Sequence, residues 1–153
     1  MIRLDDHDRR ILALVQRNNQ RSYDELGQEL ALSPSAVRRR LKRLRDEGVI
    51  VADVSLVDSG KSRVTVITSI RFVNESHAAY QAFKERMSKA KEVAQVYTVS
   101  GEADFVVIGH FSNMPGYEEW IDRHILSDDN IQRCDTNIVF SRVKYETAVD
   151  FDE

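Results

Sequence analysis

The chain has 153 residues, enough for one medium-sized domain or two small ones, and its 42% hydrophobic and 31% charged residues are typical of a soluble globular protein. No run of about 18 apolar residues occurs, and the first residues lack an apolar core, so neither a transmembrane helix nor a secretion signal is predicted. Cys134 is the only cysteine, which excludes an intrachain disulfide and favours a reducing cytoplasm.

Charge is distributed unevenly along the chain, although its net value is only −3. Residues 1–50 contain 11 basic and 8 acidic residues, a net charge of +3, whereas residues 51–153 contain 11 and 17, a net charge of −6. Only the first part should therefore be attracted to phosphate groups, which points to nucleic acid as its partner.

The first fifty residues predict three helices separated by short polar breaks. Asp5 or Asp6 can cap the free N–H groups of the first helix, and residues 18–20 end it. The second helix begins with Ser22 and Glu25 at capping-box spacing, where each side chain can accept a hydrogen bond from the other residue's backbone.

The third helix begins at Ser33, a capping residue, and Pro34 follows at the first turn, where no N–H group is needed. Gly48 ends it, because glycine adopts a left-handed conformation readily. Its apolar residues recur at helical spacing: Val37, Leu41 and Leu44. Three short helices in this order predict a helix-turn-helix.

The rest of the chain alternates between β-branched strands and amphipathic helices. Strands are predicted at 64–73, 93–99, 104–111 and 131–143, and helices at 76–88 and from residue 113 onward. The order β-α-β-β-α-β is that of the ferredoxin-like fold, in which helices cover one face of an antiparallel sheet. The acidic tail at 150–153 is expected to fray.

We therefore expect an α+β protein with two domains. A three-helix, winged helix-turn-helix occupies residues 1–50, a hinge occupies 51–62, and a ferredoxin-like domain occupies 63–153. Within and beside the hinge, residues 49–51 and 54–57 are expected to be extended.

The third predicted helix carries six cations and no acid between Arg38 and Arg45. When its apolar residues face inward, Ser35, Arg39 and Lys42 point to the opposite side. Such a helix fits the major groove of DNA, because arginine can bond guanine edges and other cations can hold phosphates. The alternative is a solvated charged face, but we expect these cations to lack acidic partners four residues away.

The predicted DNA contacts come from this helix, from its start and from the start of the second helix. They are Arg21, Ser22, Ser33, Ser35, Arg38, Arg39, Lys42 and Arg43. We expect Arg39 to read a base and Arg43 to hold a phosphate.

Several motifs occur in an order that resembles one family of regulators. Residues 4–12 (LDDHDRRIL), 32–41 (LSPSAVRRRL) and 48–50 (GVI) resemble the first half of the Lrp/AsnC, or feast/famine, family. Residues 100–104 (SGEAD) resemble its G-x-x-D turn, and Thr136 lies in a strand like its last one. This resemblance covers nearly the whole chain and implies a cytoplasmic transcription regulator that binds double-stranded DNA and is not an enzyme.

The resemblance also implies a small-molecule effector, commonly an amino acid, and homodimers that pair through their sheets and often assemble into octamers. The implied effector-binding residues are Ser100, Gly101, Glu102, Ala103, Asp104 and Thr136. Gly101 would let the backbone approach a ligand closely, exposed N–H groups of the turn could hold a carboxylate, and Asp104 could pair with an ammonium group. The alternative is a plain hairpin, in which Gly101 supplies the turn and Asp104 caps it.

One pair of residues departs from the family pattern. The family usually has a small alanine inside the second helix and a glycine at the turn that follows, whereas here Gly27 and Ala31 occupy those positions in the opposite order. A left-handed Ala31 and a helical Gly27 would each cost about 1 kcal/mol. We therefore expect a less stable turn, not a lost one.

Two other functions compete with the regulator. Sirohaem decarboxylases resemble the same family and share its two-domain plan, but the intact basic helix argues against such an enzyme. An architectural DNA-binding protein without an effector would cover DNA independently of its sequence. No metal or cofactor is predicted, because the four histidines show no ligand spacing, and Cys134 is expected to be a small sheet residue.

Overall fold

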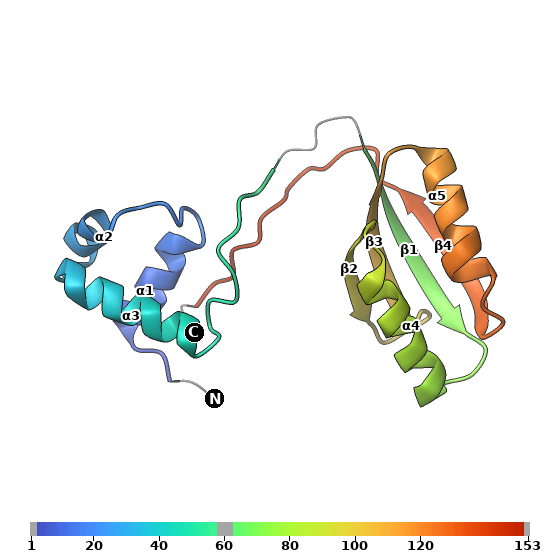
Figure 1. Cartoon of the computed structure of the whole chain (residues 1–153), viewed down its shortest axis with the longest axis horizontal. Helices are drawn as coiled ribbons and strands as arrows, with labels where there is room; N and C mark the ends of the chain where they lie inside the picture. The colour runs from blue at the N-terminus through green and yellow to red at the C-terminus, as the bar shows by residue number, and fades with distance from the viewer. Residues whose placement is uncertain (1–2, 58–62, 152–153) are drawn as a thin grey trace. The chain divides into compact units, whose positions relative to one another are not determined.

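The computed structural model describes residues 3–57 and 63–151, so the turn expected at 58–62 lies outside the described residues. Two compact units are present: the helical unit, within residues 1–57 and 144–153, and the sheet unit, within residues 58–143 (Figure 1). Among the helices of the described ranges, none has the length and apolarity needed to cross a membrane.

The three predicted helices of the helical unit are confirmed. They are α1 (Asp6–Val15), α2 (Tyr23–Leu30) and α3 (Pro34–Asp46). The capping box of Ser22 and Glu25 forms as expected, Ser33 caps α3, and a second capping box joins Asp5 to Asp8 at the start of α1. The buried core of this unit consists of Ile11, Leu12, Leu26, Leu30, Val37, Leu41 and Leu44.

The turn between α2 and α3 depends on the exchanged pair of small residues. Ala31 has a φ of 53° and a ψ of 42°, the left-handed conformation that the sequence predicts. Gly27 is buried, and a Cβ atom there would lie only 2.6 Å from the carbonyl oxygen of Leu32. The glycine inside α2 is therefore needed for close approach, and it does more than lower helix propensity.

A buried carboxylate joins α1 to α3. The side chain of Asp8 is 1% exposed, and its oxygens accept hydrogen bonds from Arg40 Nη1, at 2.8 Å, and from Arg43 Nη2. Asp5 accepts a second hydrogen bond from Arg40 Nη1, at 2.6 Å. Asp8 of α1 and its N-cap residue Asp5 thus neutralise two arginines of α3. These ion pairs set how α3 lies against α1.

The C-terminal segment belongs to the helical unit, whereas the sequence predicts it as the end of a domain at 63–153. Gln16 Nε2 donates to the carbonyl oxygen of Val149 at 3.0 Å, and the N–H group of Val149 donates to Gln16 Oε1 at 2.8 Å. Phe151 packs against the core of the three helices. The expected fraying of residues 150–153 is therefore wrong as far as Phe151, because packing of its partly buried ring on the helices holds the segment in place.

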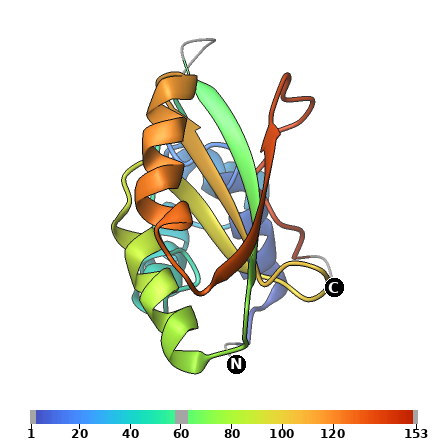
Figure 2. The ribbon, with the colours of Figure 1, turned by 90° about the vertical axis from the view of Figure 1, so that its right-hand side faces the viewer.

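The sheet unit has the expected ferredoxin-like order. Its elements are β1 (Val64–Phe72), α4 (His77–Lys89), β2 (Val93–Thr98), β3 (Phe105–Phe111), α5 (Met114–Ile121), the π-helix η2 (Asp122–Leu126) and β4 (Ile131–Ile138). The strands form one antiparallel sheet in the order β2-β3-β1-β4. Figure 2 shows α4 and α5 on the same face of this sheet.

Alternate residues of the strands face the two helices. Val66, Ile70 and Phe72 of β1 are buried there, as the period of two predicts. Phe72 contacts Phe83 of α4 and Phe105 of β3 in edge-on geometry, with ring centroids 5.5 and 5.7 Å apart. The core of the sheet unit therefore lies between the sheet and its helices, and the opposite face has no layer over it among the described residues.

One predicted strand is shorter in the structure, and the segment expected to be extended pairs with no strand. The fourth strand ends at Ile138 and does not reach residue 143, because its partner β1 begins at Val64 and only one further bond, from Val139 N to Thr65 O, continues the ladder. Residues 49–57 contain no strand, because no neighbouring strand supplies ladder hydrogen bonds to them.

Replacing Ala31 by glycine should stabilise the helical unit by up to about 1 kcal/mol, because glycine relieves the left-handed strain. Replacing Gly27 by alanine should destabilise it by about 1–3 kcal/mol, because the new Cβ would overlap Leu32 O. Urea denaturation followed by circular dichroism measures both changes. A lower stability of Ala31→Gly would contradict this account of the turn.

The stability of the helical unit should fall as the pH drops from about 4 to 2. Burial raises the pKa of Asp5, but hydrogen bonds from Arg40 and from the Asp8 N–H group outweigh it and lower that pKa from 3.8 to about 2. A folded-state pKa below the unfolded value adds stability above pH 3.8, which is lost as the pH falls through 2. Half of the Asp5 side chain is exposed, so solvent weakens the effect.

Acid titration of Asp5→Asn tests this contribution. The difference in unfolding free energy between the native protein and the variant should shrink as the pH decreases through this window. A difference that stays constant from pH 5 to pH 2 would show that Asp5 and Arg40 are not coupled in the folded state.

Candidate nucleic-acid interface and ligand-binding turn

The outer face of α3 is open to solvent as predicted. Val37, Leu41 and Leu44 are buried, whereas Ser35, Arg38 and Arg39 are exposed. Among the described residues, no acid lies within salt-bridge distance of Arg38 or Arg39. Two arginines with free guanidinium groups and a serine therefore face outward from one helix, which is the arrangement that base and phosphate recognition requires.

The other cations of α3 have acidic partners, so the expectation that they lack i,i+4 acids is wrong. Lys42 Nζ lies 2.5 Å from Asp46, and Arg43 Nε lies 3.8 Å from Glu47. These acids lie just beyond the basic run, within one turn of the helix. The Lys42 side chain is still 75% exposed, and an exposed pair of this kind is weak enough to exchange for a phosphate.

The remaining predicted contacts lie at helix starts and already have internal partners. The guanidinium group of Arg21 pairs with Glu29. The Ser22 hydroxyl donates to Glu25 at 2.8 Å, and the backbone N–H of Ser22 lowers the pKa of that carboxyl. The Ser33 hydroxyl accepts from an N–H group of α3. These side chains shape the ends of the helices, where free N–H groups favour an anion.

Residues 100–104 form the turn between β2 and β3. Gly101 has a φ of 120°, which favours glycine, and the N–H group of Val99 donates to the carbonyl oxygen of Asp104 at 3.0 Å. Arg71 Nη1 donates to the carbonyl oxygen of Glu102 at 3.0 Å. The turn is held from β1 as well as by its own ends, although Ser100, Gly101 and Glu102 are exposed.

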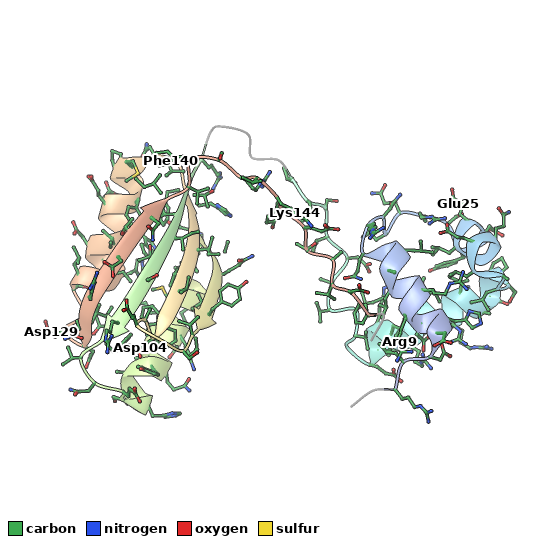
Figure 3. All side chains as sticks on the ribbon, turned by 180° about the vertical axis from the view of Figure 1, so that it is seen from behind. Arg9, Glu25, Asp104, Asp129, Phe140 and Lys144 are labelled. Atoms are coloured by element: carbon green, nitrogen blue, oxygen red, sulfur yellow. The ribbon has the colours of Figure 1, made fainter. Side chains whose placement is uncertain are left out.

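Asp104, labelled in Figure 3, has both carboxylate oxygens engaged inside the sheet unit. One oxygen accepts the N–H group of Phe72 at 2.7 Å, and the other accepts the Tyr80 hydroxyl at 2.6 Å. The second bond raises the pKa of Tyr80 to about 12. Asp104 therefore ties the turn to β1 and α4, and this positioning role is closer to the capping function than to a free partner for an ammonium group.

Thr136 lies on a different part of the sheet from the turn. It pairs with Thr68 of β1, and β1 lies between β4 and β3. Its hydroxyl contacts the Tyr117 hydroxyl of α5 at 2.5 Å. Within one chain the structure therefore does not bring Thr136 together with residues 100–104.

Two partners of the candidate site residues were missed from the sequence, namely Asp8 beneath α3 and Tyr80 beside Asp104. Asp8 and Asp5 have the spacing of an N-terminal cap, which hides their second role as partners of arginines 32 or more residues away. Tyr80 follows the apolar spacing of its helix, so nothing in that pattern predicts a polar contact. Only the packing of α4 on the sheet brings its hydroxyl to Asp104.

Comparison with protein families matches both parts of the chain. Residues 4–51 match a winged helix-turn-helix DNA-binding domain, and residues 65–149 match the Lrp/AsnC ligand-binding domain. The second match alone covers more than half of the chain, and together the two include the exposed face of α3 and the turn at 100–104.

Whole-length relatives agree with these matches. The chain is 39% identical to an uncharacterized HTH-type transcriptional regulator, y4tD, of Sinorhizobium fredii, over 95% of this chain and 88% of that protein. It is 30% identical to the transcriptional regulator AzlB of Bacillus subtilis, over 99% and 98%. The crystal structure of a Neisseria meningitidis transcriptional regulator in complex with L-Met superposes with a TM-score of 0.89, at 26% identity and 98% coverage of both chains. The chain belongs to the Lrp/AsnC family of transcription regulators.

Proposed function

We propose that this protein recognises specific sequences of double-stranded DNA through α3 and that an amino acid bound near residues 100–104 modulates this binding. The observation that carries the first part is the pair Arg38 and Arg39, exposed and without acidic partners on a helix whose apolar side is buried. Arginines placed in this way can read guanine edges in the major groove.

The DNA contacts divide into two groups with different tasks. Arg38 and Arg39, with Ser35 before them, form the centre of the interface and supply base contacts. The flanking groups hold phosphates and orient the helix. They are Arg21, Ser22, Ser33 and Lys42. Arg43 is predicted in this group from the sequence, but its guanidinium group pairs with the buried Asp8.

The uncovered face of the sheet supports pairing of two copies. Ile67, Val106 and Ile108 lie at the centre of this face and are half-buried, and Tyr97 beside them is 51% exposed. An antiparallel sheet with apolar residues on both faces needs a second layer on each side. A homodimer formed through these faces carries two copies of α3 for a two-fold symmetric DNA site, and dimers assemble further, commonly into octamers.

The turn at 100–104 offers a ligand its backbone more than its carboxylate. No hydrogen bond to another described residue is donated by the N–H groups of Gly101, Glu102 or Ala103. Free N–H groups in such a turn can hold the carboxylate of an amino acid, while Asp104 keeps the turn in shape. Thr136 joins the site only if a second subunit places it there. The solved relative that contains L-Met supports this class of ligand.

Ligand and DNA binding are coupled by linkage. An amino acid that binds one assembly or spacing of dimers more tightly than another shifts the population toward it. The factor by which the amino acid changes the affinity for DNA equals the factor by which DNA changes the affinity for the amino acid. An architectural protein would instead show no effector response and would footprint DNA without regard to sequence. A sirohaem decarboxylase would bind a tetrapyrrole and change its absorption spectrum. We expect neither result.

Replacing Arg39 by alanine should weaken binding to a selected DNA site by about 1–3 kcal/mol and relax the preference for one base pair. In vitro selection of bound duplexes defines the site, and fluorescence anisotropy measures both proteins on it. Arg9→Ala, which removes an α1 cation paired with Asp6, is the matched control and should bind normally (Figure 3). Equal losses for both variants would contradict base recognition by Arg39.

An amino acid that occupies the turn should raise the melting temperature by roughly 5–10 °C at a hundred times its dissociation constant. Differential scanning fluorimetry with the twenty amino acids measures this shift. Asp104→Asn should reduce it, because the single amide oxygen can accept from only one of the two donors that hold the turn, the Phe72 N–H group and the Tyr80 hydroxyl. Asp129→Asn, an exposed acid outside the turn, should keep it. Absence of any shift in the native protein would leave only a structural hairpin.

A further inference from the structure

We propose that Asp8 is a positioning residue that holds Arg40 and Arg43 back from DNA phosphate and thereby limits the sequence-independent affinity of α3. This inference rests on the proposed DNA binding. Asp8 lies on α1 and does not face the proposed interface. In this proposal it nevertheless controls how much of the positive charge of α3 is available to DNA.

The geometry commits both oxygens of Asp8 to the recognition helix. Arg40 Nη1 donates to one oxygen at 2.8 Å and Arg43 Nη2 to the other, while the N–H group of Asp5 donates to the second oxygen at 3.1 Å. The carboxylate is 1% exposed, whereas the Arg43 side chain is 41% exposed. Arg43 therefore reaches the surface of α3 with its charge directed inward.

Burial makes this pairing hard to exchange for a phosphate contact. Water has little access to a carboxylate that is 1% exposed, so movement of Arg43 toward DNA would leave one Asp8 oxygen with only the Asp5 N–H group as its donor and would remove half of the positive charge that compensates the carboxylate. The exposed pair of Lys42 with Asp46 has no such barrier. The same helix thus carries cations that DNA can recruit and cations that it cannot.

The remaining charge of α3 is small once these pairs are considered. Arg40 and Arg43 are held by Asp8, and Arg45 Nε is held by Asp53 at 2.9 Å. Of the cations of α3, only Arg38 and Arg39 have no ion pair with a described residue. A helix that is rich in arginine therefore presents few free charges, which favours base recognition over general attraction to DNA.

The test is the salt dependence of binding to a random-sequence duplex, measured for the full chain with Asp8→Asn. The amide keeps the size of the carboxylate but not its charge, so Arg43 becomes free to bind phosphate. We expect the slope of log affinity against log salt concentration to steepen by about 0.9. The affinity of the variant relative to the native protein should therefore be roughly eightfold higher at 0.1 M salt than at 1 M. A purely structural role would lower the affinity and would not steepen the slope.

Asp6→Asn is the matched control, because it removes the same charge from an exposed position on the same helix, where the side chain is 96% exposed. It should change the slope by less than half as much. Equal slopes for Asp8→Asn and the native protein, with both folded by circular dichroism, would overturn the proposal. If the native protein binds no duplex at all, the proposed function fails instead.

A second comparison tests the proposal even if the Asp8→Asn variant does not fold. In the native background, Arg43→Gln should reduce the slope by much less than Lys42→Gln, because Arg43 is already neutralised by buried Asp8 whereas the pair of Lys42 with Asp46 is exposed. Equal reductions of about 0.9 for both variants would show that Arg43 makes a full phosphate contact, and the proposal would then be wrong.

Discussion

The helical unit depends on one buried ionic contact, in which the Asp8 carboxylate receives Arg40 and Arg43 of α3. A carboxylate that is closed to water is stable only when its charge is compensated and its oxygens are hydrogen-bonded. The contact therefore sets the orientation of α3 against α1 and decides which arginines face outward. The DNA-facing surface that we propose is what remains after this internal pairing.

The sheet unit uses a similar arrangement at its candidate ligand turn. Asp104 precedes β3, and its two oxygens accept hydrogen bonds from neighbouring elements, one from the backbone of Phe72 and one from Tyr80. In both units, an acid that could be interpreted as a free functional group is part of the framework instead. In the function that we propose, recognition is then left to groups that the framework exposes, which are arginines in one unit and backbone N–H groups in the other.

Local rules predict most of the secondary structure, because its causes lie within a few residues. The capping box of Ser22 and Glu25 and the inward face of Val37 each follow from spacing along one helix, whereas the left-handed Ala31 was expected from the resemblance to the family. The same rules failed for the end of the last strand, which depends on where β1 begins. They also failed for Phe151, which packs against helices more than a hundred residues earlier in the chain.

The sequence by itself determined the two-part organisation, the order of strands and helices, the basic helix and the position of the candidate turn. It could do so because periodicity and turn chemistry are local properties. Only the tertiary structure decided the use of individual charges. It showed that Arg43 faces a buried acid, that Asp104 binds Tyr80, and that Gly27 leaves room for Leu32. These facts depend on distances between residues that are remote in sequence or meet only across a turn, and packing alone brings such groups together.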